Sequence, residues 1–271
     1  LINILYNTSI VKKIIFAYIV LMFCTLSVNA DTDGKNSLSK NNPETIEDCF
    51  EGLNRATFKF NQTFDGVILK PVAKAYKVLP SSIRSGVSNS LDNLSNLVTI
   101  PNNILQGDIK EAGKNTVRFA VNTTLGILGI FDVAKDMGFT DYIKEDYGQT
   151  LGAMGVGPGC YLVLPVLGPT TVRDTAGSFT NALGGDVWYN VSVKNDTQHF
   201  EERDYYMTRV ASGVDFRAKN LQTLDNLEKN SLDFYASVKS LYLQDRQQKI
   251  SNSKKTVGTL NDSDWEEIET Q

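Results

Sequence analysis

Histidine and cysteine are scarce in this chain, and their scarcity restricts the chemistry that it can support. The 271 residues include one histidine, His199, and three cysteines, Cys24, Cys49 and Cys160. A zinc site needs several such side chains at close spacing, which a lone histidine and scattered cysteines do not provide. His199 also lies in a polar stretch that is typical of a protein surface. We therefore expect neither a metal site nor a catalytic histidine.

The sequence also lacks the motifs of common enzyme active sites. No G-x-S-x-G motif is present, which argues against a serine esterase or phospholipase. Gly155-Val156-Gly157 begins like the dinucleotide-binding fingerprint, but Cys160 stands at the position of its third glycine. No other residue pattern indicates catalysis. The sequence therefore predicts a protein that is not an enzyme and that has no cofactor.

Long apolar runs and an excess of basic charge are missing as well. No run reaches the roughly 18 apolar residues that a membrane-spanning helix needs. The formal net charge is −4, whereas a nucleic-acid-binding protein presents a basic face. Hydrophobic residues make up 41% of the chain and charged residues 21%, which is typical of a globular protein. Nucleic acid is therefore not an expected partner.

The first 30 residues have the pattern of an export signal. Two lysines precede an apolar stretch over residues 14–26, and Val28 and Ala30 are small residues of the kind that signal peptidase reads. We expect a signal peptide over residues 1–30 and a mature chain that begins at Asp31.

Composition divides the remainder of the chain into three parts. Residues 31–47 are rich in Asn, Ser, Lys and Asp, and such a segment is expected to be a flexible linker. Residues 251–271 are similar and end in acidic residues, so we expect a disordered acidic tail. Between them, residues 48–250 carry apolar positions that recur at helical spacing. The sequence predicts one mostly α-helical domain there.

Capping residues and prolines predict where several helices begin and end. Two helix starts match a capping box, Asp48 with Glu51 and Asp108 with Glu111. Pro71 and Pro101 each follow an apolar stripe and are expected to end the preceding helix, and Pro71 is expected to open a second helix through Val78. Alternation of period two is confined to short pieces within residues 187–193.

The segment over residues 148–173, GQTLGAMGVGPGCYLVLPVLGPTTVR, is apolar and interrupted by glycine and proline. The prolines exclude a long helix and disfavour the interior of a strand, because proline has no N–H to donate. Two interpretations remain open: a buried core loop and a wall that faces lipid. The residues expected to form this apolar wall are Gly155, Gly157, Pro158, Gly159, Tyr161, Leu164, Pro165, Leu167, Gly168 and Pro169.

Four segments resemble, in the same order, the MlaA (VacJ) family of phospholipid-binding proteins. They lie at residues 48–76, 96–134, 148–177 and 231–248. The third, GQTLGAMGVGPGCYLVLPVLGPTTVRDTAG, is similar to the central signature of that family. The resemblance implies a ring-like helical domain whose amphipathic helices lie in the interface of the Gram-negative outer membrane, on its periplasmic side, without spanning it. Periodicity alone does not separate such lipid-facing helices from an ordinary helical core.

The resemblance also implies a function and its partners. Family members remove mislocalised phospholipids from the outer leaflet of the outer membrane. They associate with a trimeric porin and pass the lipid to a periplasmic carrier, MlaC, which maintains lipid asymmetry. Two alternatives remain open on the residues alone: a soluble periplasmic scaffold that binds proteins without lipid, and a lipid-modifying hydrolase.

Several site residues follow from the same resemblance. A glycine-bearing hydrophobic hairpin beside the lipid passage matches Leu125, Gly126, Ile127, Leu128, Gly129, Ile130 and Phe131. Leu128 and Phe131 would line or gate that passage, and the two glycines would supply positive φ at the bend; a packed inter-helix loop is the alternative. Arg55 would meet a lipid phosphate or form a surface salt bridge. Arg173 and Asp174 would form an ion pair that fixes the ring.

The three cysteines receive separate predictions. The family is usually lipidated on a cysteine that follows a small residue, but Cys24 follows Phe23, so we expect no acyl chain there. Export permits a disulfide between Cys49 and Cys160, yet two cysteines do not establish one. Both occupy positions where the family more often has proline. We interpret them as small apolar fillers.

Overall fold

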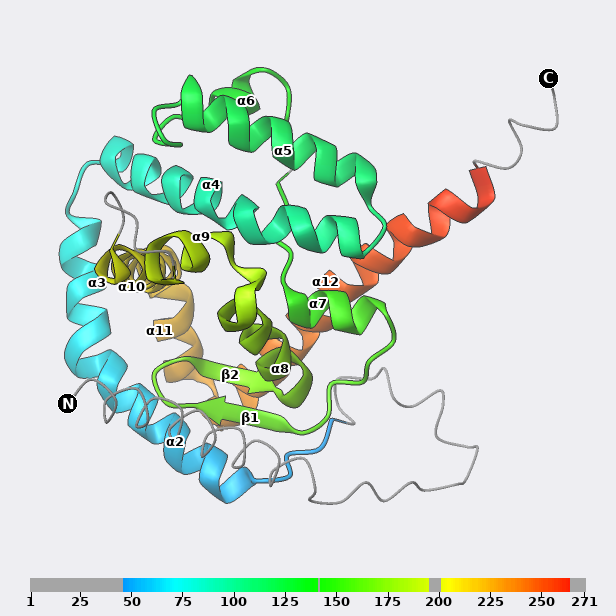
Figure 1. The fold of residues 1–271 in the computed structure, drawn as a ribbon. Coiled ribbons are helices and arrows are strands. Elements are labelled where there is room, and N and C mark those ends of the chain that lie inside the picture. Colours follow the sequence, from blue (N-terminus) through cyan, green and yellow to red (C-terminus); the bar gives the residue numbers. More distant parts are fainter. Residues whose placement is uncertain (1–45, 141, 195–200, 264–271) are drawn as a thin grey trace, which may run out of the picture. The chain divides into compact units, whose positions relative to one another are not determined.

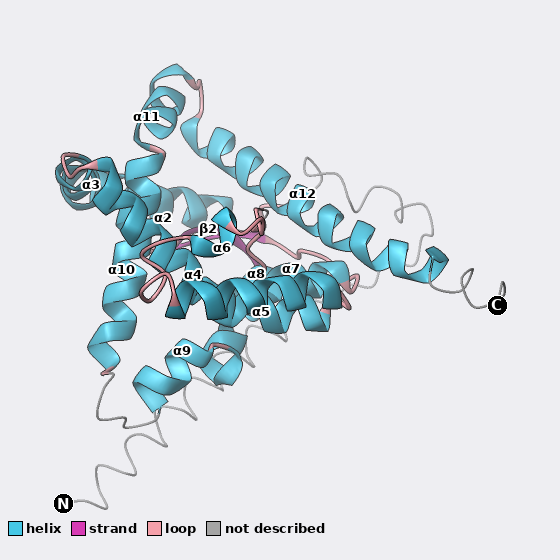
Figure 2. Ribbon diagram, turned by 90° about the horizontal axis from the view of Figure 1, so that it is seen from above, coloured by secondary structure: helices cyan, strands magenta, loops and turns pink. Residues whose placement is uncertain are grey.

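The structure is a computed structural model that describes residues 46–140, 142–194 and 201–263, all of which belong to one compact unit. Helices dominate this unit, and a small two-stranded sheet is set among them (Figures 1 and 2). The fold is mostly α, as the sequence predicts. Within the described ranges, no helix combines the length and the apolar character needed to cross a membrane. The expected signal peptide, Cys24, residues 31–45 and His199 lie outside the described residues.

The first helical run passes through Pro71 without a break. Helix α2 (Glu51–Phe64) passes into a π-helical turn, η2 (Asp65–Leu69), which leads directly into α3 (Lys70–Lys77). The prediction that Pro71 opens a second helix is confirmed by α3, but the predicted stop before it is wrong, because the π-helical turn continues into α3 without a break. Pro71 stands within the first two positions of α3, where its missing N–H is tolerated, and the π-helical turn before it accommodates the altered hydrogen bonding.

Helices α4 (Ser81–Leu105) and α5 (Ile109–Thr124) lie side by side (Figures 1 and 2). Pro101 stands inside α4 and does not end it, so this boundary prediction is also wrong. The turn around Pro101 gains another hydrogen bond, since the Asn102 side-chain amide donates to the Val98 carbonyl at 2.8 Å. Packing against α5 then holds the helix together beyond the proline.

The two predicted capping boxes have different outcomes. Asp108 is the N-cap of α5 and accepts a hydrogen bond from the Glu111 backbone N–H at 3.0 Å, which confirms the predicted cap, but the Asp108 backbone N–H donates to the Asn103 carbonyl and not to Glu111. At the start of α2 the prediction is wrong, because the N-cap is Phe50 and no side chain caps that end. The Asp48 carboxylate accepts hydrogen bonds from the side chains of Asn54 and Tyr235 instead.

The Gly/Pro segment folds as a β-hairpin. After the short helices α6 (Val133–Asp136) and α7 (Tyr147–Ala153), strand β1 (Tyr161–Leu164) pairs antiparallel with β2 (Gly168–Thr171). Pro169 opposes Val163, whose N–H donates to Asn54 of α2, away from β2. The pair is therefore not hydrogen-bonded, and the missing N–H of proline costs the ladder nothing. The expectation that the prolines disfavour a strand here is therefore wrong, because Pro169 occupies a position that needs no N–H donor.

After β2, the described part of the chain consists of helices and short connections. It contains α8 (Val172–Thr180), η3 (Asn181–Gly185), α9 (Val187–Tyr189), η4 (Asn190–Lys194), α10 (Glu202–Lys219), α11 (Leu221–Asn230) and α12 (Phe234–Ser263). Residues 187–193, where the sequence alternates, are helical because Asp186 caps α9 through the N–H groups of Trp188 and Tyr189. Helix α12 continues to Ser263, into the predicted tail.

The interior has an apolar part and a polar part. Tyr161, Val163, Tyr235 and Leu243 form an apolar cluster where β1 meets α12. Along α4 and α5, by contrast, the buried side chains are mainly polar, and they include Asn93, Asn96, Asn102, Asn103, Asn115, Arg118 and Asn122. The interface of these two helices is therefore polar, whereas Ile104, Ile109 and Val117 on the same helices are exposed.

Candidate functional site

A polar cavity of about 230 Å³ lies beside α4, α5 and α6. Helix α4 contributes four side chains at helical spacing, and the others come from α5, from α6 with its N-cap, and from the segment after α6. The lining residues are Asn89, Asp92, Asn93, Asn96, Arg118, Asn122, Asp132, Lys135, Thr140 and Tyr142. No aliphatic side chain is among them, which is unusual for a cavity between helices.

Asp132 organises the wall formed by α5 and α6. Its carboxylate accepts two hydrogen bonds from Arg118, at 3.0 and 2.9 Å, and one from the Asn122 amide at 2.9 Å. It also caps α6, and the Asn122 side-chain oxygen accepts from the Ala134 N–H at 2.9 Å. Nη2 of Arg118 contacts both carboxylate oxygens, and Nη1 donates to the Phe139 carbonyl, so the guanidinium ties Asp132 to the segment after α6.

Tyr142, in the segment after α6, also lines the cavity. Its hydroxyl donates to the Asp92 backbone carbonyl at 3.1 Å, and the Arg118 guanidinium lies 5.6 Å from its ring centroid. Burial raises the pKa of the Tyr142 phenol above its ordinary value, so it remains a neutral hydrogen-bond donor.

The apolar hairpin, residues 125–131, connects α5 to α6 and carries an unusual backbone. Ile127, Leu128 and Gly129 have φ values of 52°, 57° and 86°, in the left-handed region that side chains with a Cβ disfavour. Leu128 is 70% exposed and Phe131 58%. Such strain persists only where the surroundings impose it, and it often marks a functional segment.

The contacts of the apolar hairpin place it directly beside the cavity. The Asn89 side-chain amide donates to the Ile130 carbonyl at 3.2 Å. A Cβ on Gly129 would stand 2.6 Å from the Asn93 Cβ, so only glycine permits this approach. Asn89 and Asn93 both line the cavity. The hairpin and the polar wall of α4 are therefore in contact.

Gly126 is required for a reason other than the predicted positive φ. Its φ lies outside the left-handed region, and only Gly129 of the two glycines has the predicted value. A Cβ on Gly126 would stand 2.2 Å from the Phe131 carbonyl oxygen and 2.5 Å from the Asn122 carbonyl oxygen. The constraint at Gly126 is thus the close approach of two backbone segments.

The predicted apolar wall is divided between core and surface. Tyr161 is fully buried and Val163 nearly so, whereas Val166 and Leu167 at the tip of the β-hairpin are 58% and 79% exposed. Leu164, Gly168 and Pro169 are of intermediate burial, and Gly155, Gly157, Gly159 and Pro165 are exposed. The base of the β-hairpin therefore packs in the protein core, and its tip presents apolar side chains outward. None of these residues lines the polar cavity.

The three charged residues singled out by resemblance also lie away from the cavity. Arg55 pairs with Glu51 at 2.7 Å and with Asp233 at 2.8 Å, and these hydrogen bonds raise its pKa. Arg173 pairs with Asp174 at 2.9 Å, and both side chains are buried. Asp174 also accepts from Arg246 of α12 at 2.8 Å. Arg173 and Asp174 thus belong to a buried ionic network between helices.

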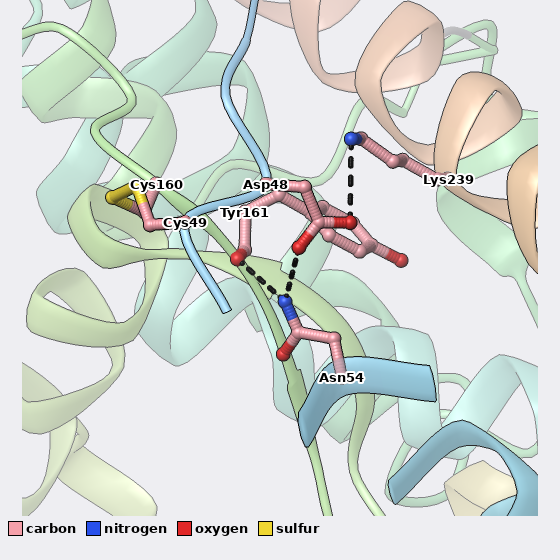
Figure 3. The surroundings of a disulfide bond; sticks show 6 residues. All are labelled: Asp48, Cys49, Asn54, Cys160, Tyr161 and Lys239. Atoms are coloured by element: carbon pink, nitrogen blue, oxygen red, sulfur yellow. Dashed lines mark hydrogen bonds and ion pairs between the residues drawn. A yellow bond between two sulfur atoms is a disulfide. The ribbon is translucent and has the colours of Figure 1, made fainter. Parts of the chain in front are cut away.

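Cys49 and Cys160 form a disulfide, with their Cα atoms 5.6 Å apart (Figure 3). The prediction that both are apolar fillers is therefore wrong. The two cysteines are 111 residues apart in sequence, and only the fold brings the start of α2 next to β1. Asn54 reinforces this junction by donating to the Tyr161 carbonyl at 3.0 Å and to Asp48 at 2.6 Å (Figure 3).

Sequence reasoning did not identify the cavity residues. The sequence signal that could have indicated the cavity is the helical spacing of Asn89, Asn93 and Asn96 along one face of α4. The apolar stripe of the same helix is more conspicuous. Across the described ranges, no cluster of three or more His, Cys, Asp or Glu side chains is arranged to hold a metal ion.

Comparison with known proteins gives consistent matches. Residues 46–249 match the family model described as MlaA lipoprotein. A Haemophilus influenzae protein named intermembrane phospholipid transport system lipoprotein MlaA is 30% identical over 243 residues, which cover 84% of this chain and 89% of that protein. The Escherichia coli protein of the same name is 32% identical over 229 residues, which cover 81% and 82%.

Two further matches extend this set. An uncharacterized protein of Rickettsia bellii is 33% identical over 245 residues, which cover 86% of this chain and 92% of that protein. A solved structure, described as the structural basis for maintenance of bacterial outer membrane lipid asymmetry, matches with a TM-score of 0.65 and 33% identity. That match covers 75% of this chain and 99% of the solved chain.

Proposed function

This chain belongs to the MlaA lipoprotein family, and on that basis we propose that it removes mislocalised phospholipids from the outer leaflet of the outer membrane. The lipid is then passed to a periplasmic carrier for return to the inner membrane. Relatives are named as lipoproteins of an intermembrane phospholipid transport system, which supports a role in lipid transport. This transport requires no bond to be broken, so the proposal includes no catalytic step.

The contact between the polar cavity and the apolar hairpin carries this proposal. A phospholipid has a charged head and two apolar tails, so a protein that moves it must offer a polar path next to an apolar surface. The cavity offers the polar path through Asn89, Asn93 and Arg118, and the hairpin offers exposed Leu128 and Phe131 beside it. We propose that the head enters the cavity while the tails stay along the hairpin.

Exposed apolar side chains on several elements support an interfacial position in the membrane. They include Leu53, Phe60 and Val67 on the first helical run, and Leu167 at the tip of the β-hairpin. Amphipathic elements of this kind bind in the membrane interface without spanning it. The proposed partners are a trimeric porin in the outer membrane and the soluble carrier MlaC on its periplasmic side. A soluble scaffold that never meets lipid would have little reason to expose so many apolar side chains.

The proposal is tested by complementation in an Escherichia coli strain that lacks its own relative. Expression of this chain is expected to restore outer-membrane lipid asymmetry, measured as phospholipid in the outer leaflet. The Gly126→Ala variant is expected to fail, because its Cβ forces the hairpin away from the Phe131 and Asn122 carbonyls. Gly126→Val and Gly129→Val are expected to perturb lipid movement in the same assay.

A matched glycine provides the control. Gly113 lies on α5, and a Cβ there meets no atom within 4 Å, so Gly113→Ala is expected to restore asymmetry as well as the wild type. Circular dichroism separates a displaced hairpin from global unfolding. Normal asymmetry with Gly126→Ala would contradict a role for the hairpin, and lack of any restoration by the wild-type chain would contradict the proposed function itself.

A further inference from the structure

The charges and hydrogen-bonding groups of the polar cavity are distributed unevenly between its walls. Helix α4 contributes three amides and one carboxylate, Asp92, and no cation. The wall formed by α5 and α6 contributes both cations of the lining, Arg118 and Lys135. One side of the cavity thus offers acceptors to a positive group, and the other offers donors to a negative group.

The acceptors on α4 are only partly used by the protein. The side-chain oxygens of Asn93 and Asn96 are buried and accept no hydrogen bond from any described residue, although a buried acceptor normally has a partner. Asp92 pairs with Lys144 at 2.6 Å at the surface, and a carboxylate has capacity for further hydrogen bonds. The α4 wall therefore has acceptor capacity that the described residues do not use.

The two cations of the opposite wall differ in availability. The Arg118 guanidinium is committed to both carboxylate oxygens of Asp132. Lys135 is exposed, and its ammonium forms no ion pair or hydrogen bond with any residue that the structure describes. Because Arg118 is paired with Asp132, Lys135 is the cation among the described lining residues that is left to meet an anion.

We propose that the cavity selects phospholipids with a primary-ammonium head, such as phosphatidylethanolamine, and that it binds the ammonium at Asp92, Asn93 and Asn96 and the phosphate at Lys135. This inference rests on the proposed function and extends it to the class of lipid head. A water molecule occupies ~30 Å³ of liquid, so about 230 Å³ accommodates a head of about eight non-hydrogen atoms.

Other heads fit the same walls less well. A quaternary choline ammonium has no N–H to donate, and it is usually bound by several aromatic rings, whereas Tyr142 is the only aromatic residue of the lining. A glycerol head carries no ammonium, so it brings no second cation to Asp92 beside Lys144. Selection is therefore expected against both phosphatidylcholine and phosphatidylglycerol.

The test is a competition among three lipids for the purified full-length chain in detergent. The protein is incubated with equal amounts of phosphatidylethanolamine, phosphatidylcholine and phosphatidylglycerol of identical acyl chains, and the bound lipid is quantified by mass spectrometry. We expect phosphatidylethanolamine to be enriched about tenfold over each competitor, which corresponds to ~1.4 kcal/mol. Asp92→Asn and Lys135→Glu are expected to reduce this enrichment. Lys110→Glu makes the same charge change on an exposed part of α5 away from the cavity and is expected to preserve it.

The outcomes separate the inference from the proposed function. Bound lipid in the proportions supplied would overturn head selection and leave lipid transport standing. Equal enrichment of phosphatidylcholine would also overturn it, because hydrogen bonds from the ammonium would then have no effect. Absence of any bound phospholipid in the wild type would count against the proposed function itself. The wild-type competition alone decides the inference if a variant fails to fold.

Discussion

At the scale of single residues, asparagine side chains of α2 complete the hydrogen bonding of a strand. Asn54 donates to the Tyr161 carbonyl and accepts from the Val163 N–H. Seven residues later, about two helical turns along α2, Asn61 donates to the Leu164 carbonyl and accepts from the Val166 N–H. The two amides thus replace a neighbouring strand along the outer edge of β1. Their i, i+7 spacing places both on one face of the helix.

The Cys49–Cys160 disulfide joins the start of α2 to that same strand, and its loss is expected to destabilise the protein. A disulfide that closes a loop of 111 residues restricts the unfolded chain, and removal of such a bond typically costs ~2–4 kcal/mol. We therefore expect the Cys49→Ser/Cys160→Ser double variant to have a lower urea midpoint than the wild type. Reductant should lower the wild-type midpoint and leave that of the double variant unchanged. An effect of reductant on both proteins would contradict the assignment of the stability to this bond.

At the scale of elements, one arginine of α12 connects three helices. Arg246 binds the Asp146 carboxylate, which caps α7, at 2.6 and 2.9 Å, and it binds Asp174 of α8 at 2.8 Å. Tyr242, one turn earlier on α12, donates to Asp174 at 2.7 Å. Breaking such a buried pair leaves an uncompensated charge, so these contacts fix how α12 sits against α7 and α8.

This ionic network is expected to make stability depend on acid. Burial raises the pKa of Asp146, but hydrogen bonds from Arg246 and its charge outweigh burial and place the pKa at about 2, below the ordinary value of 3.8. Because the folded pKa is the lower one, the stabilisation is complete above about pH 4 and is lost as the pH falls to about 2. Urea unfolding between pH 5 and pH 2 measures this loss, which Asp146→Asn should reduce.

Asp245, the neighbour of Arg246 on α12, provides a control for the predicted acid dependence. Asp245 is exposed and pairs with Lys249, one turn later on α12, at 2.7 Å. Asp245→Asn is therefore expected to leave the acid dependence of unfolding as in the wild type. Equal slopes below pH 4 for the wild type and Asp146→Asn would contradict the role assigned to Asp146.

Sequence patterns predict the helical elements better than their ends and contacts. The stripes at helical spacing are local, so the helical class and the Asp108 cap follow from residues a few positions apart. The continuation of helices past Pro71 and Pro101 depends on a π-helical turn and on packing with α5, neither of which a local pattern contains. The disulfide and the polar cavity depend on residues brought together over long sequence distances, which explains why periodicity did not reveal them.

At the scale of the whole molecule, the exposed apolar side chains belong to elements far apart in sequence. They lie on the first helical run, on the apolar hairpin, at the tip of the β-hairpin and on α10, where Met207 and Val210 are each 61% exposed. No single element is apolar enough to span a membrane within the described ranges. Attachment through these side chains would therefore be distributed over several shallow contacts.

The tip of the β-hairpin allows this attachment to be tested apart from folding. Leu167 is 79% exposed, so Leu167→Asp is expected to change the free energy of unfolding by less than ~0.5 kcal/mol. The same change places a charge where the proposal expects lipid, and binding to phospholipid vesicles should weaken. Vesicle flotation measures the binding, and urea unfolding measures the stability.

An exposed polar site provides the comparison for this variant. Gln222→Asp adds the same charge on α11, at an exposed position, and is expected to change neither vesicle binding nor stability. Vesicle binding by Leu167→Asp equal to that of the wild type would exclude the tip from the membrane-binding surface. A large loss of stability in Leu167→Asp would instead indicate that the tip is covered by protein.

The pairing of the β-hairpin has a consequence for the behaviour of the chain in concentrated solution. A short apolar strand pair with open edges is a template on which copies of a protein can polymerise. At the outer edge of β1, the side chains of Asn54 and Asn61 already bond the backbone donors and acceptors. At the outer edge of β2, Pro169 has no N–H to offer an incoming strand. Both routes to sheet extension are thus obstructed by side chains already present. A β-hairpin with an exposed apolar tip can in this way be carried by a chain that resists amyloid-like assembly.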